Sequence, residues 1–469
     1  MKITLIQPKA WKDNPGYVFE PLGLGYLASY LKLKGHTNIS VKLSAFDSDS
    51  DIVEDAVKSD LIGITATSSM MTHGKQLAGK IKEKNKSTVI VFGGAHPTSC
   101  PETTIEDENI DIVCRGESEE TLYEVAAAVE HNKPYAGIVG ISYKSEGEVI
   151  HNKARIPVYD LDSLPYPDRD LIRQKTFSTL FLKSYGRRSA FVFGGRGCPY
   201  KCSYCATDSV WGRQVRLRSP ENIIGEIEEL IKMYGVNYIN FADDTFTINR
   251  KHVLELCELF KKKRLSVEWS CNVHPKTADK QLFKEMQGAG CTEIWVGVES
   301  GSQDILDELK RNYTIDEIKE LFAFAKEAGL KRQAYIMVGT PGESKETLKQ
   351  TEKLIEQIKP DIVFMSLFVP IPGSELYLKA RKNGHVKDNM DWSDIKLIHA
   401  GLPGTRFLPR DELLKEANAL YNKMKKYTRR NKFNLLKIAR LVPEKLKNTK
   451  TKDYPQLITK LLDYIKRPV

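Results

Sequence analysis

The chain has 469 residues, of which 41% are hydrophobic and 28% charged, and its formal net charge is +10. This length exceeds one ordinary domain and the composition is that of a globular protein, so we expect two or three domains. No apolar run reaches the roughly 18 residues of a membrane span, and the first residues lack a secretory signal pattern. Eight cysteines are too few for a disulfide scaffold, so we expect a cytoplasmic chain whose clustered thiols bind metal or react.

Short apolar segments alternate with helical patterns over the first part of the chain. The segments are rich in Val and Ile and are bounded by polar residues or Gly, as buried strands are. This alternation predicts an α/β fold with a doubly wound, Rossmann-like parallel sheet, which binds ligands beyond the carboxyl ends of its strands. We place this domain at 1–135, and its expected strands are 3–7, 41–46, 61–67, 89–94 and 111–114.

A hairpin pattern at 137–150 and a stretch rich in Pro and Asp at 159–172 interrupt the alternation, so we assign 136–187 to a hairpin and linker. Further strand and helix units then predict a partial (β/α)6 barrel at 188–395, a fold in which chemistry collects at the strand ends. Its expected strands are 190–195, 236–242, 267–273, 293–299, 332–339 and 361–368.

The last segment, 396–469, is predicted to be helical and basic. From Asp411 to Val469 the chain has 16 Lys and Arg against 6 Asp and Glu, which accounts for the whole net charge of +10. The stretch 431–442 alternates basic and apolar residues, a pattern typical of a helix lying on an anionic membrane surface. A helix packed on the barrel with a solvated lysine face is the simpler alternative. A nucleic-acid surface is disfavoured because aromatic residues for base stacking are few.

Three cysteines, Cys198, Cys202 and Cys205, lie within eight residues directly after the first predicted barrel strand. Thiolates are soft ligands that suit zinc or iron–sulfur clusters. A structural zinc site needs four protein ligands, and no fourth ligand follows nearby. A four-iron cluster held by three cysteines leaves one iron open for a small molecule, and this interpretation fits the spacing better.

The loop GCPYKCSYCA (197–206) resembles the cluster loop of the radical S-adenosylmethionine (SAM) enzymes. The resemblance implies a 4Fe-4S cluster on the three cysteines, with SAM bound to the open iron through its amino and carboxylate groups. In that family an electron from the cluster cleaves SAM into methionine and a 5′-deoxyadenosyl radical, which takes a hydrogen atom from an unreactive position. Tyr204 matches the family's aromatic residue near the adenine.

Motifs in the order found in this family follow at 241–247, 297–302, 338–344 and 370–377. The resemblance implies that an aspartate of FADDTFT accepts a hydrogen bond from the amino group of SAM, since an ammonium group needs acceptors. It also implies that the glutamate of GVESGS reaches the ribose hydroxyls and that the glycine-rich loop VGTPGES passes close to the adenine. The implied SAM-binding residues are Tyr204, Asp243, Asp244, Glu299, Ser300 and Gly339.

The first domain resembles that of the cobalamin-binding radical SAM subgroup in its segments 21–31, 63–70, 91–98 and 113–122. Ordinary strand-to-helix turns are the alternative explanation of these segments. The cobalt-ligating histidine of an Asp-x-His-x-x-Gly motif is missing after the second strand, and His96 is expected at the polar surface. Small residues at strand ends let a bulky cofactor approach the backbone. The implied cobalamin-binding residues are Ser68, Ser69, Gly93, Gly94 and Glu117.

The other cysteines show no second cluster motif, and we expect them to be small buried hydrophobes. Only two of them lie in the first domain, which disfavours the tRNA methylthiotransferases, whose second cluster uses three N-terminal cysteines. These residues are Cys100, Cys114, Cys257, Cys271 and Cys291.

The expected function is cobalamin-dependent methylation of an unactivated carbon, in a lipid or isoprenoid if the tail binds a membrane. Radical dehydration, cyclisation or carbon–carbon bond formation without cobalamin is the alternative. A structural iron–sulfur or zinc protein with a basic partner-binding tail is the non-enzyme alternative. The enzyme is expected to take a small-molecule or lipid substrate and an external electron donor such as flavodoxin or ferredoxin, and not to bind nucleic acid. We expect it in the cytoplasm or peripherally on the inner membrane surface.

Overall fold

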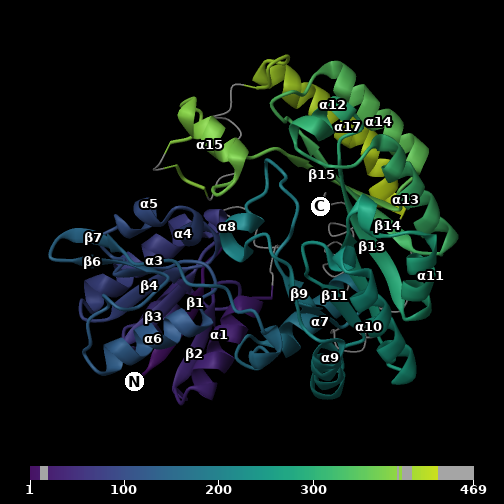
Figure 1. The fold of residues 1–469 in the computed structure, drawn as a ribbon. Coiled ribbons are helices and arrows are strands. Elements are labelled where there is room, and N and C mark those ends of the chain that lie inside the picture. Colours follow the sequence, from purple (N-terminus) through teal and green to yellow (C-terminus); the bar gives the residue numbers. More distant parts are fainter. Residues whose placement is uncertain (11–19, 388–389, 393–403, 431–469) are drawn as a thin grey trace, which may run out of the picture.

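The computed structural model describes residues 1–10, 20–387, 390–392 and 404–430. Two α/β units lie side by side, the first at the left of Figure 1 and the second, curved like an open barrel, at the right. No helix in these ranges is long and apolar enough to cross a membrane.

The first unit is a seven-stranded sheet with the order β2-β1-β3-β4-β5-β6-β7. The first five strands in this order run parallel, and helices bury apolar residues on both faces of the sheet. This arrangement confirms the doubly wound fold. Its parallel strands are β1 (Ile3–Gln7), β2 (Ile39–Leu43), β3 (Leu61–Thr65), β4 (Val89–Gly93) and β5 (Ile112–Cys114). One face carries α1 (Leu22–Leu33) and α6 (Glu119–Glu130), and the other carries α2 (Asp49–Ala56) and α3 (Met71–Lys84).

The hairpin expected between the domains belongs to the first sheet. β6 (Ile141–Ser145) pairs antiparallel with β5, and β7 (Glu148–His151) follows it at the edge. A hairpin pattern does not reveal which strand it joins, because that depends on which sheet edge is free. The same segment also forms α7 (Gln174–Tyr185), whose Phe177 packs into the core of the first unit. The segment 136–187 is therefore more than a linker, while the exact domain boundaries stay predictions.

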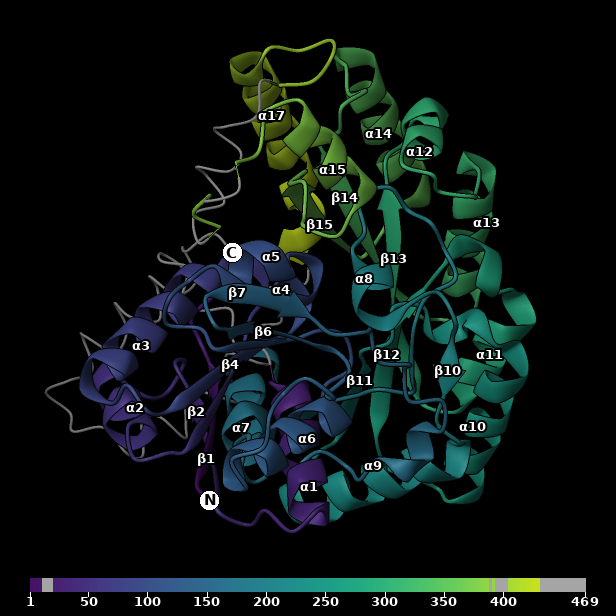
Figure 2. The same ribbon diagram turned by 60° about the vertical axis from the view of Figure 1, so that its left-hand side comes forward.

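The second unit is a sheet of six parallel strands in the order β15-β14-β13-β12-β11-β8, with helices on its convex side (Figures 1 and 2). Alternate strand residues such as Phe241, Trp269 and Val296 are buried in the core shared with those helices. The linear strand order confirms the partial barrel. The strands are β8 (Ser189–Val192), β11 (Tyr238–Phe241), β12 (Glu268–Val273), β13 (Cys291–Glu299), β14 (Lys331–Val338) and β15 (Ile362–Leu367). The helices include α9 (Pro220–Tyr234), α10 (Arg250–Lys262), α11 (Lys280–Gly288), α13 (Ile315–Glu327) and α14 (Lys345–Ile358).

The described part of the C-terminal region is a helix packed on the barrel. α17 (Arg410–Arg430) lies against β15 and α14. Its apolar residues recur at helical spacing and enter the barrel core. The stretch 431–442, for which we expect an amphipathic helix, lies outside the described residues. The core residues of α17 are Leu413, Ala417, Leu420 and Met424.

A buried ion-pair network joins the two units. Arg169 lies with Nη1 3.3 Å from Glu20 Oε2 and with Nη2 2.5 Å from Glu226 Oε1. Glu226 belongs to α9 and also pairs with Arg218, while Glu20 accepts the backbone N–H of Phe191 in β8 at 3.0 Å. Burial raises the pKa of Glu20, although Arg169 opposes the rise. Because a buried carboxylate must be paired, the contact between the units depends on Arg169.

Replacing Arg169 with methionine should lower the free energy of unfolding by about 3 to 5 kcal/mol, because Glu20 then stays buried without a charged partner and Glu226 keeps only Arg218. Arg173→Met is the control. Arg173 pairs with Asp47 and has 31% of its side chain exposed, and pairs near the surface contribute about 1 kcal/mol or less. Urea titrations followed by circular dichroism measure both variants. Equal losses would show that the Arg169 network does not support the contact between the units.

Candidate active site

The cysteine loop extends from a two-stranded ribbon that follows the carboxyl end of β8. β9 (Gly195–Arg196) pairs antiparallel with β10 (Arg216–Leu217), and α8 (Thr207–Trp211) lies between them in the chain. The chain turns out of the ribbon at Gly197, whose φ is +97° and where an added Cβ would lie 2.2 Å from the carbonyl oxygen of Gln214. Only glycine fits this turn. Strands of two residues leave no periodic pattern, so the ribbon could not be predicted from the sequence.

Hydrogen-bond donors surround the sulfurs of the three cysteines. Cys202 Sγ is 3.1 Å from Arg311 Nη1, and Cys205 Sγ is 3.5 Å from the backbone N of Thr207. Cys198 Sγ is 3.8 Å from a threonine hydroxyl. Burial raises the pKa of the Cys198 and Cys205 thiols, and these hydrogen bonds oppose the rise.

The three thiols are free and share one loop, and cysteine thiolates are the usual ligands of iron–sulfur clusters. Their donor-rich surroundings therefore fit such a cluster, with Cys198, Cys202 and Cys205 as the residues that would hold it. Within the described part of the chain, no group of three or more His, Cys, Asp or Glu side chains is placed to hold a single metal ion.

Tyr204 and Glu299, which lie in separate motifs, meet beside the cysteine loop. The Tyr204 hydroxyl donates to Glu299 Oε1 at 2.7 Å. Glu299 ends β13 in the left-handed region, with φ of +61°, where the register with β14 shifts after Gly297. Burial raises the pKa of Glu299, while Arg311 and Tyr204 oppose the rise. The strand end thus holds a buried carboxylate next to the cluster loop, as a contact to ribose hydroxyls requires.

Arg311 is a site residue that sequence analysis missed. Its Nη1 lies 3.3 Å from the Tyr204 hydroxyl as well as near Cys202, and its Nη2 donates to the carbonyl oxygen of Gly297 at 3.1 Å. Its guanidinium also lies 4.7 Å from the ring centroid of Tyr313. Arg311 therefore places a cation between the cysteine loop and the end of β13. The sequence LKRNY offers no signal for this position, because a basic residue after a helix usually faces solvent.

The two aspartates of FADDTFT differ in their surroundings. Asp243 is 6% exposed and accepts the backbone N–H of Gly194 at 2.8 Å. Burial raises the pKa of Asp243 to about 7, although the Gly194 hydrogen bond opposes the rise. Asp244 is exposed and lies 3.3 Å from the hydroxyl of Thr207, which also contacts Cys205. Of the two, Asp244 is therefore the carboxylate that is available to an ammonium group beside the cluster loop.

Ser300 and Gly339 contact the protein's own helix α14 and the loop before it. Ser300 is buried, and its Oγ lies 3.2 Å from Thr351 Oγ1 in α14. Gly339 has φ of +90°, and its backbone N–H donates to Glu343 Oε2 at 3.3 Å. Burial raises the pKa of Glu343 to about 7. The hydroxyl of Ser300 is engaged away from the cysteine loop, so its contact with SAM stays a prediction, as does that of Gly339.

The carboxyl edge of the first sheet is formed by small residues. Ser68 and Ser69 follow β3, and Gly93 and Gly94 follow each other at the end of β4. Gly94 has φ of +97°, and an added Cβ would lie 2.9 Å from the carbonyl oxygen of Ala66, so only glycine lets the two strand ends approach. An added Cβ at Gly93 would have only ordinary contacts, the closest at 3.8 Å. This edge fits a bulky cofactor such as cobalamin, which needs access to the backbone.

Glu117, the fifth residue expected to bind cobalamin, pairs with the barrel instead. Its Oε2 lies 2.9 Å from Arg196 Nη1, and its other oxygen pairs with Arg216. The side chain of Glu117 is 4% exposed. Its carboxylate therefore joins the two units, and these contacts do not support a role in binding cobalamin.

His96 is buried, and the expectation of a place at the polar surface is wrong. Its Nδ1 lies 2.9 Å from Ser68 Oγ, and its ring meets Trp392 edge-on with 6.2 Å between centroids. Burial lowers the pKa of His96 to about 4. The sequence could not show this, because Trp392 comes from the barrel side and lies almost 300 residues further along the chain. The five cysteines outside the loop are buried as predicted.

The carboxyl edge of the first sheet adjoins the cysteine loop. α4 (Ala95–Ser99), which follows β4, contacts α8, and the two helices lie side by side in both ribbon views (Figures 1 and 2). Ser99 Oγ lies 2.8 Å from Ser209 Oγ at this contact. An added Cβ at Gly373 would lie 2.5 Å from Ser99 Oγ. The chain after β15 therefore packs closely against this contact between α4 and α8. The edge that fits cobalamin and the loop that fits the cluster are therefore neighbours.

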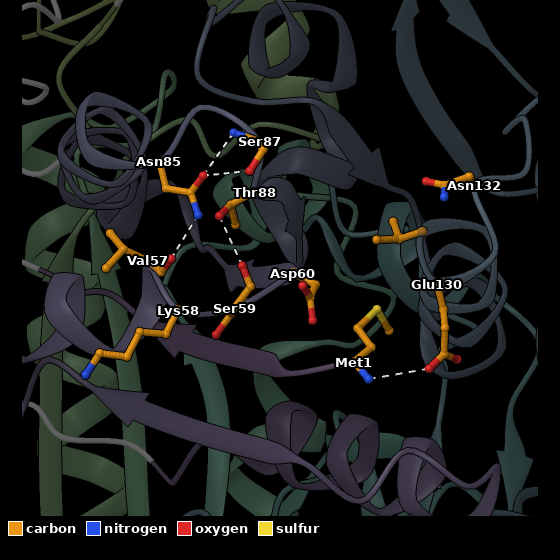
Figure 3. A pocket seen from close by; sticks show the side chains of 11 residues that line it. Met1, Val57, Lys58, Ser59, Asp60, Asn85, Ser87, Thr88, Glu130 and Asn132 are labelled. Atoms are coloured by element: carbon orange, nitrogen blue, oxygen red, sulfur yellow. Dashed lines mark hydrogen bonds and ion pairs between the residues drawn. The ribbon is translucent and has the colours of Figure 1, made fainter.

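A polar cavity of about 490 Å³ lies at the opposite edge of the first sheet (Figure 3). Asp60 and Thr88 line it and directly precede β3 and β4, and Met1, which also lines it, lies two residues before the start of β1. Asn85 in its wall donates to the carbonyl oxygen of Val57 at 2.9 Å. The cavity is separated from the cysteine loop by the length of the strands, and we assign it no cofactor.

Replacing Glu299 with alanine should weaken SAM binding about 10- to 100-fold, because a buried charged acceptor is lost. Iron content should stay unchanged, since all three cysteines remain. Glu293→Ala is the matched control on the same strand, where Glu293 accepts the Trp295 Nε1–H at 2.8 Å. Equilibrium dialysis of anaerobic protein with labelled SAM measures both. An unchanged affinity in the Glu299 variant would remove Glu299 from the SAM site.

Replacing Glu343 with glutamine should flatten the pH dependence of stability. The folded state raises this pKa from 4.5 to about 7, so the folded chain binds more protons than the unfolded chain in that window and stability falls as pH rises through it. The loss between pH 4.5 and 7 is on the order of 3 kcal/mol and should vanish in the glutamine variant. Glu346→Gln, at an exposed position of α14, is the control. Urea midpoints across pH test this, and parallel curves for both variants and the parent would contradict it.

Comparison with known proteins matches both units to families. The family model described as the radical SAM superfamily matches residues 192–355, and the model of the B12 binding domain matches residues 8–126. An uncharacterized methyltransferase of Pyrococcus horikoshii is 32% identical over 84% of this chain and 85% of its own length. The anaerobic magnesium-protoporphyrin IX monomethyl ester cyclase of Rubrivivax gelatinosus is 31% identical over 80% of this chain and 69% of its own.

Two solved structures share the fold. The radical SAM methyltransferase TsrM of Kitasatospora setae superposes with a TM-score of 0.68 at 18% identity, covering 82% of this chain and 77% of its own. The cobalamin-dependent radical SAM enzyme OxsB superposes with a TM-score of 0.70 at 18% identity, covering 90% and 66%. Both units, in the same order, recur in these proteins. The chain therefore belongs to the radical SAM superfamily, in the group with an N-terminal B12-binding domain, and its cofactors are a 4Fe-4S cluster, SAM and cobalamin.

Proposed function

We propose that the enzyme methylates an unactivated carbon of a small molecule. The observation that carries this proposal is the contact between α4 and α8, which brings the carboxyl edge of the B12-binding domain next to the cysteine loop. A methyl carrier and a radical generator must both reach one substrate atom, because bond formation requires the reacting groups to be close and oriented. The uncharacterized methyltransferase of Pyrococcus horikoshii, a relative over most of its length, supports methyl transfer.

The chain's own residues have distinct roles in this proposal. When bound, the cluster supplies the electron that cleaves SAM, and cobalamin supplies a carrier for the methyl group. Asp244 accepts the amino group of SAM, and Glu299, held by the Tyr204 hydroxyl at 2.7 Å, accepts the ribose hydroxyls. Arg311 keeps a positive charge beside Cys202, with Nη1 3.1 Å from its Sγ.

Radical ring closure is the second candidate. The cyclase of Rubrivivax gelatinosus is almost as similar in sequence as the methyltransferase. The residues around the cysteine loop would serve either reaction, because both begin with the cleavage of SAM. The two candidates differ in whether a second SAM molecule gives up its methyl group.

The substrate and partners are proposed more coarsely. The proposed substrate is a small molecule. An external reductant such as flavodoxin or ferredoxin is also proposed, because the electron that reduces the cluster must come from outside the chain. A lipid or isoprenoid substrate, and peripheral contact with the inner membrane surface, depend on the stretch 431–442. That stretch lies outside the described residues, so these remain predictions from the sequence.

The products of SAM distinguish these reactions. Reduced holoenzyme, incubated with SAM and a small-molecule extract of its host cells, should form both S-adenosylhomocysteine and 5′-deoxyadenosine. Cys202→Ala should form no 5′-deoxyadenosine, whereas Lys201→Ala, an exposed change in the same loop, should behave like the parent. Formation of 5′-deoxyadenosine without S-adenosylhomocysteine would contradict methyl transfer and support ring closure. Intact SAM in every sample would contradict an enzymatic role.

A further inference from the structure

Four charged side chains are buried where the β9–β10 ribbon meets the first domain. Arg196 and Arg216 come from the ribbon, and Glu117 and Glu119 come from the turn after β5 and the start of α6. The exposed fractions of these side chains are 6%, 4%, 4% and 7% in that order. Arg196 reaches Glu117 with Nη1 at 2.9 Å and Glu119 with Nη2 at 2.6 Å, while Arg216 pairs with Glu117. The ribbon that carries the cysteine loop is thus held by carboxylates of the cobalamin-binding domain.

The ribbon depends on these carboxylates for its own pairing. Arg196 and Arg216 are direct partners in the register of β9 and β10, so two like charges face each other. Like charges directly opposite on a strand pair repel and destabilise it. Glu117 contacts both arginines, and with Glu119 it makes the buried set electrically neutral. Removal of either carboxylate leaves the buried set with a net positive charge.

The contacts of Arg196 also fix the orientation of its guanidinium group. The Arg196 guanidinium lies 5.3 Å from the ring centroid of Tyr26 in the first domain and 4.9 Å from that of Trp211 in α8. A guanidinium fork donates in a fixed plane, so paired carboxylates hold it in one orientation, which an apolar contact does not do. Arg196 is also separated from Cys198 by a single residue, the glycine that the turn requires. A shift of the Arg196 guanidinium would therefore also move Cys198, the first of the three cysteines.

We propose that Glu117 and Glu119 are positioning residues that set the separation between the cluster loop and the cobalamin edge. They act through Arg196 and Arg216, which anchor the ribbon. Arg196 lies two residues before Cys198. The inference concerns the placement of the two cofactors, so it holds whether the enzyme transfers a methyl group or closes a ring. Its failure would leave the proposed function untouched.

Hydrogen exchange of the full chain, measured without any cofactor, tests whether Glu117 and Glu119 hold the β9–β10 ribbon in place. Glu117→Gln and Glu119→Gln should speed amide exchange in peptides covering 195–217 by about a hundredfold, because the ribbon opens locally. Glu120→Gln is the matched control, since Glu120 lies in the same turn of α6 but pairs within the first domain, 2.7 Å from Arg155 Nη1. Unchanged exchange in both test variants would overturn the proposal.

A spectroscopic distance separates positioning from simple stabilisation. In reduced holoenzyme containing cob(II)alamin, pulsed electron paramagnetic resonance reports the separation between the cobalt and cluster spins. Glu119→Gln, which leaves Glu117 on both arginines, should broaden or shift this distance distribution while each centre keeps its own spectrum. The Glu120 control should reproduce the parent. A distribution identical to the parent, in a variant that is less stable, would show a structural role only and overturn the proposal.

Discussion

Buried charge that must stay paired determines how the two units of this enzyme meet. Arg169 lies between Glu20 and Glu226, and a second set of arginines and glutamates joins the cysteine-loop ribbon to the first domain. A buried ion pair adds little net stability compared with apolar packing, but a lost partner is costly. The contact between the units therefore tolerates few relative orientations. That restriction is what an enzyme with two separate cofactors needs.

The cofactor edges follow from the direction of the strands. In the barrel sheet, and in β1 to β5 of the first sheet, the strands are parallel, so the residues after each of these strands gather at one edge, where ligands of such sheets bind. In the first unit this edge carries Ser68, Ser69 and Gly94, and in the barrel it carries the cysteine loop and Glu299. The contact between α4 and α8 joins the two edges. At the edge of the barrel, hydrogen-bond donors and the Arg311 cation lie beside the cysteine sulfurs, and the Glu299 carboxylate is buried.

Much of this arrangement could be predicted from the sequence, because strand alternation and short motifs are local features. The doubly wound sheet and the six barrel strands belong to that part, whereas the motifs pointed to Tyr204 and Glu299 without showing that their side chains meet. Arg311 and Cys202 are 109 residues apart, and their contact depends on the tertiary fold. The same holds for Glu117, where a motif residue that resembles a cofactor contact pairs with a barrel arginine 79 residues away. Ser300 illustrates a third limit, since a motif does not show which way a hydroxyl points.

Iron and cobalt content, measured with the visible spectrum of protein purified without oxygen from cells supplied with cobalamin, tests the central claim most directly. The account predicts about four irons and one cobalt per chain, because one loop of three cysteines and one carboxyl edge each hold a cofactor. Iron without cobalt, despite the supply of cobalamin, would contradict a working cobalamin site in the first domain. It would also withdraw the main support for methyl transfer.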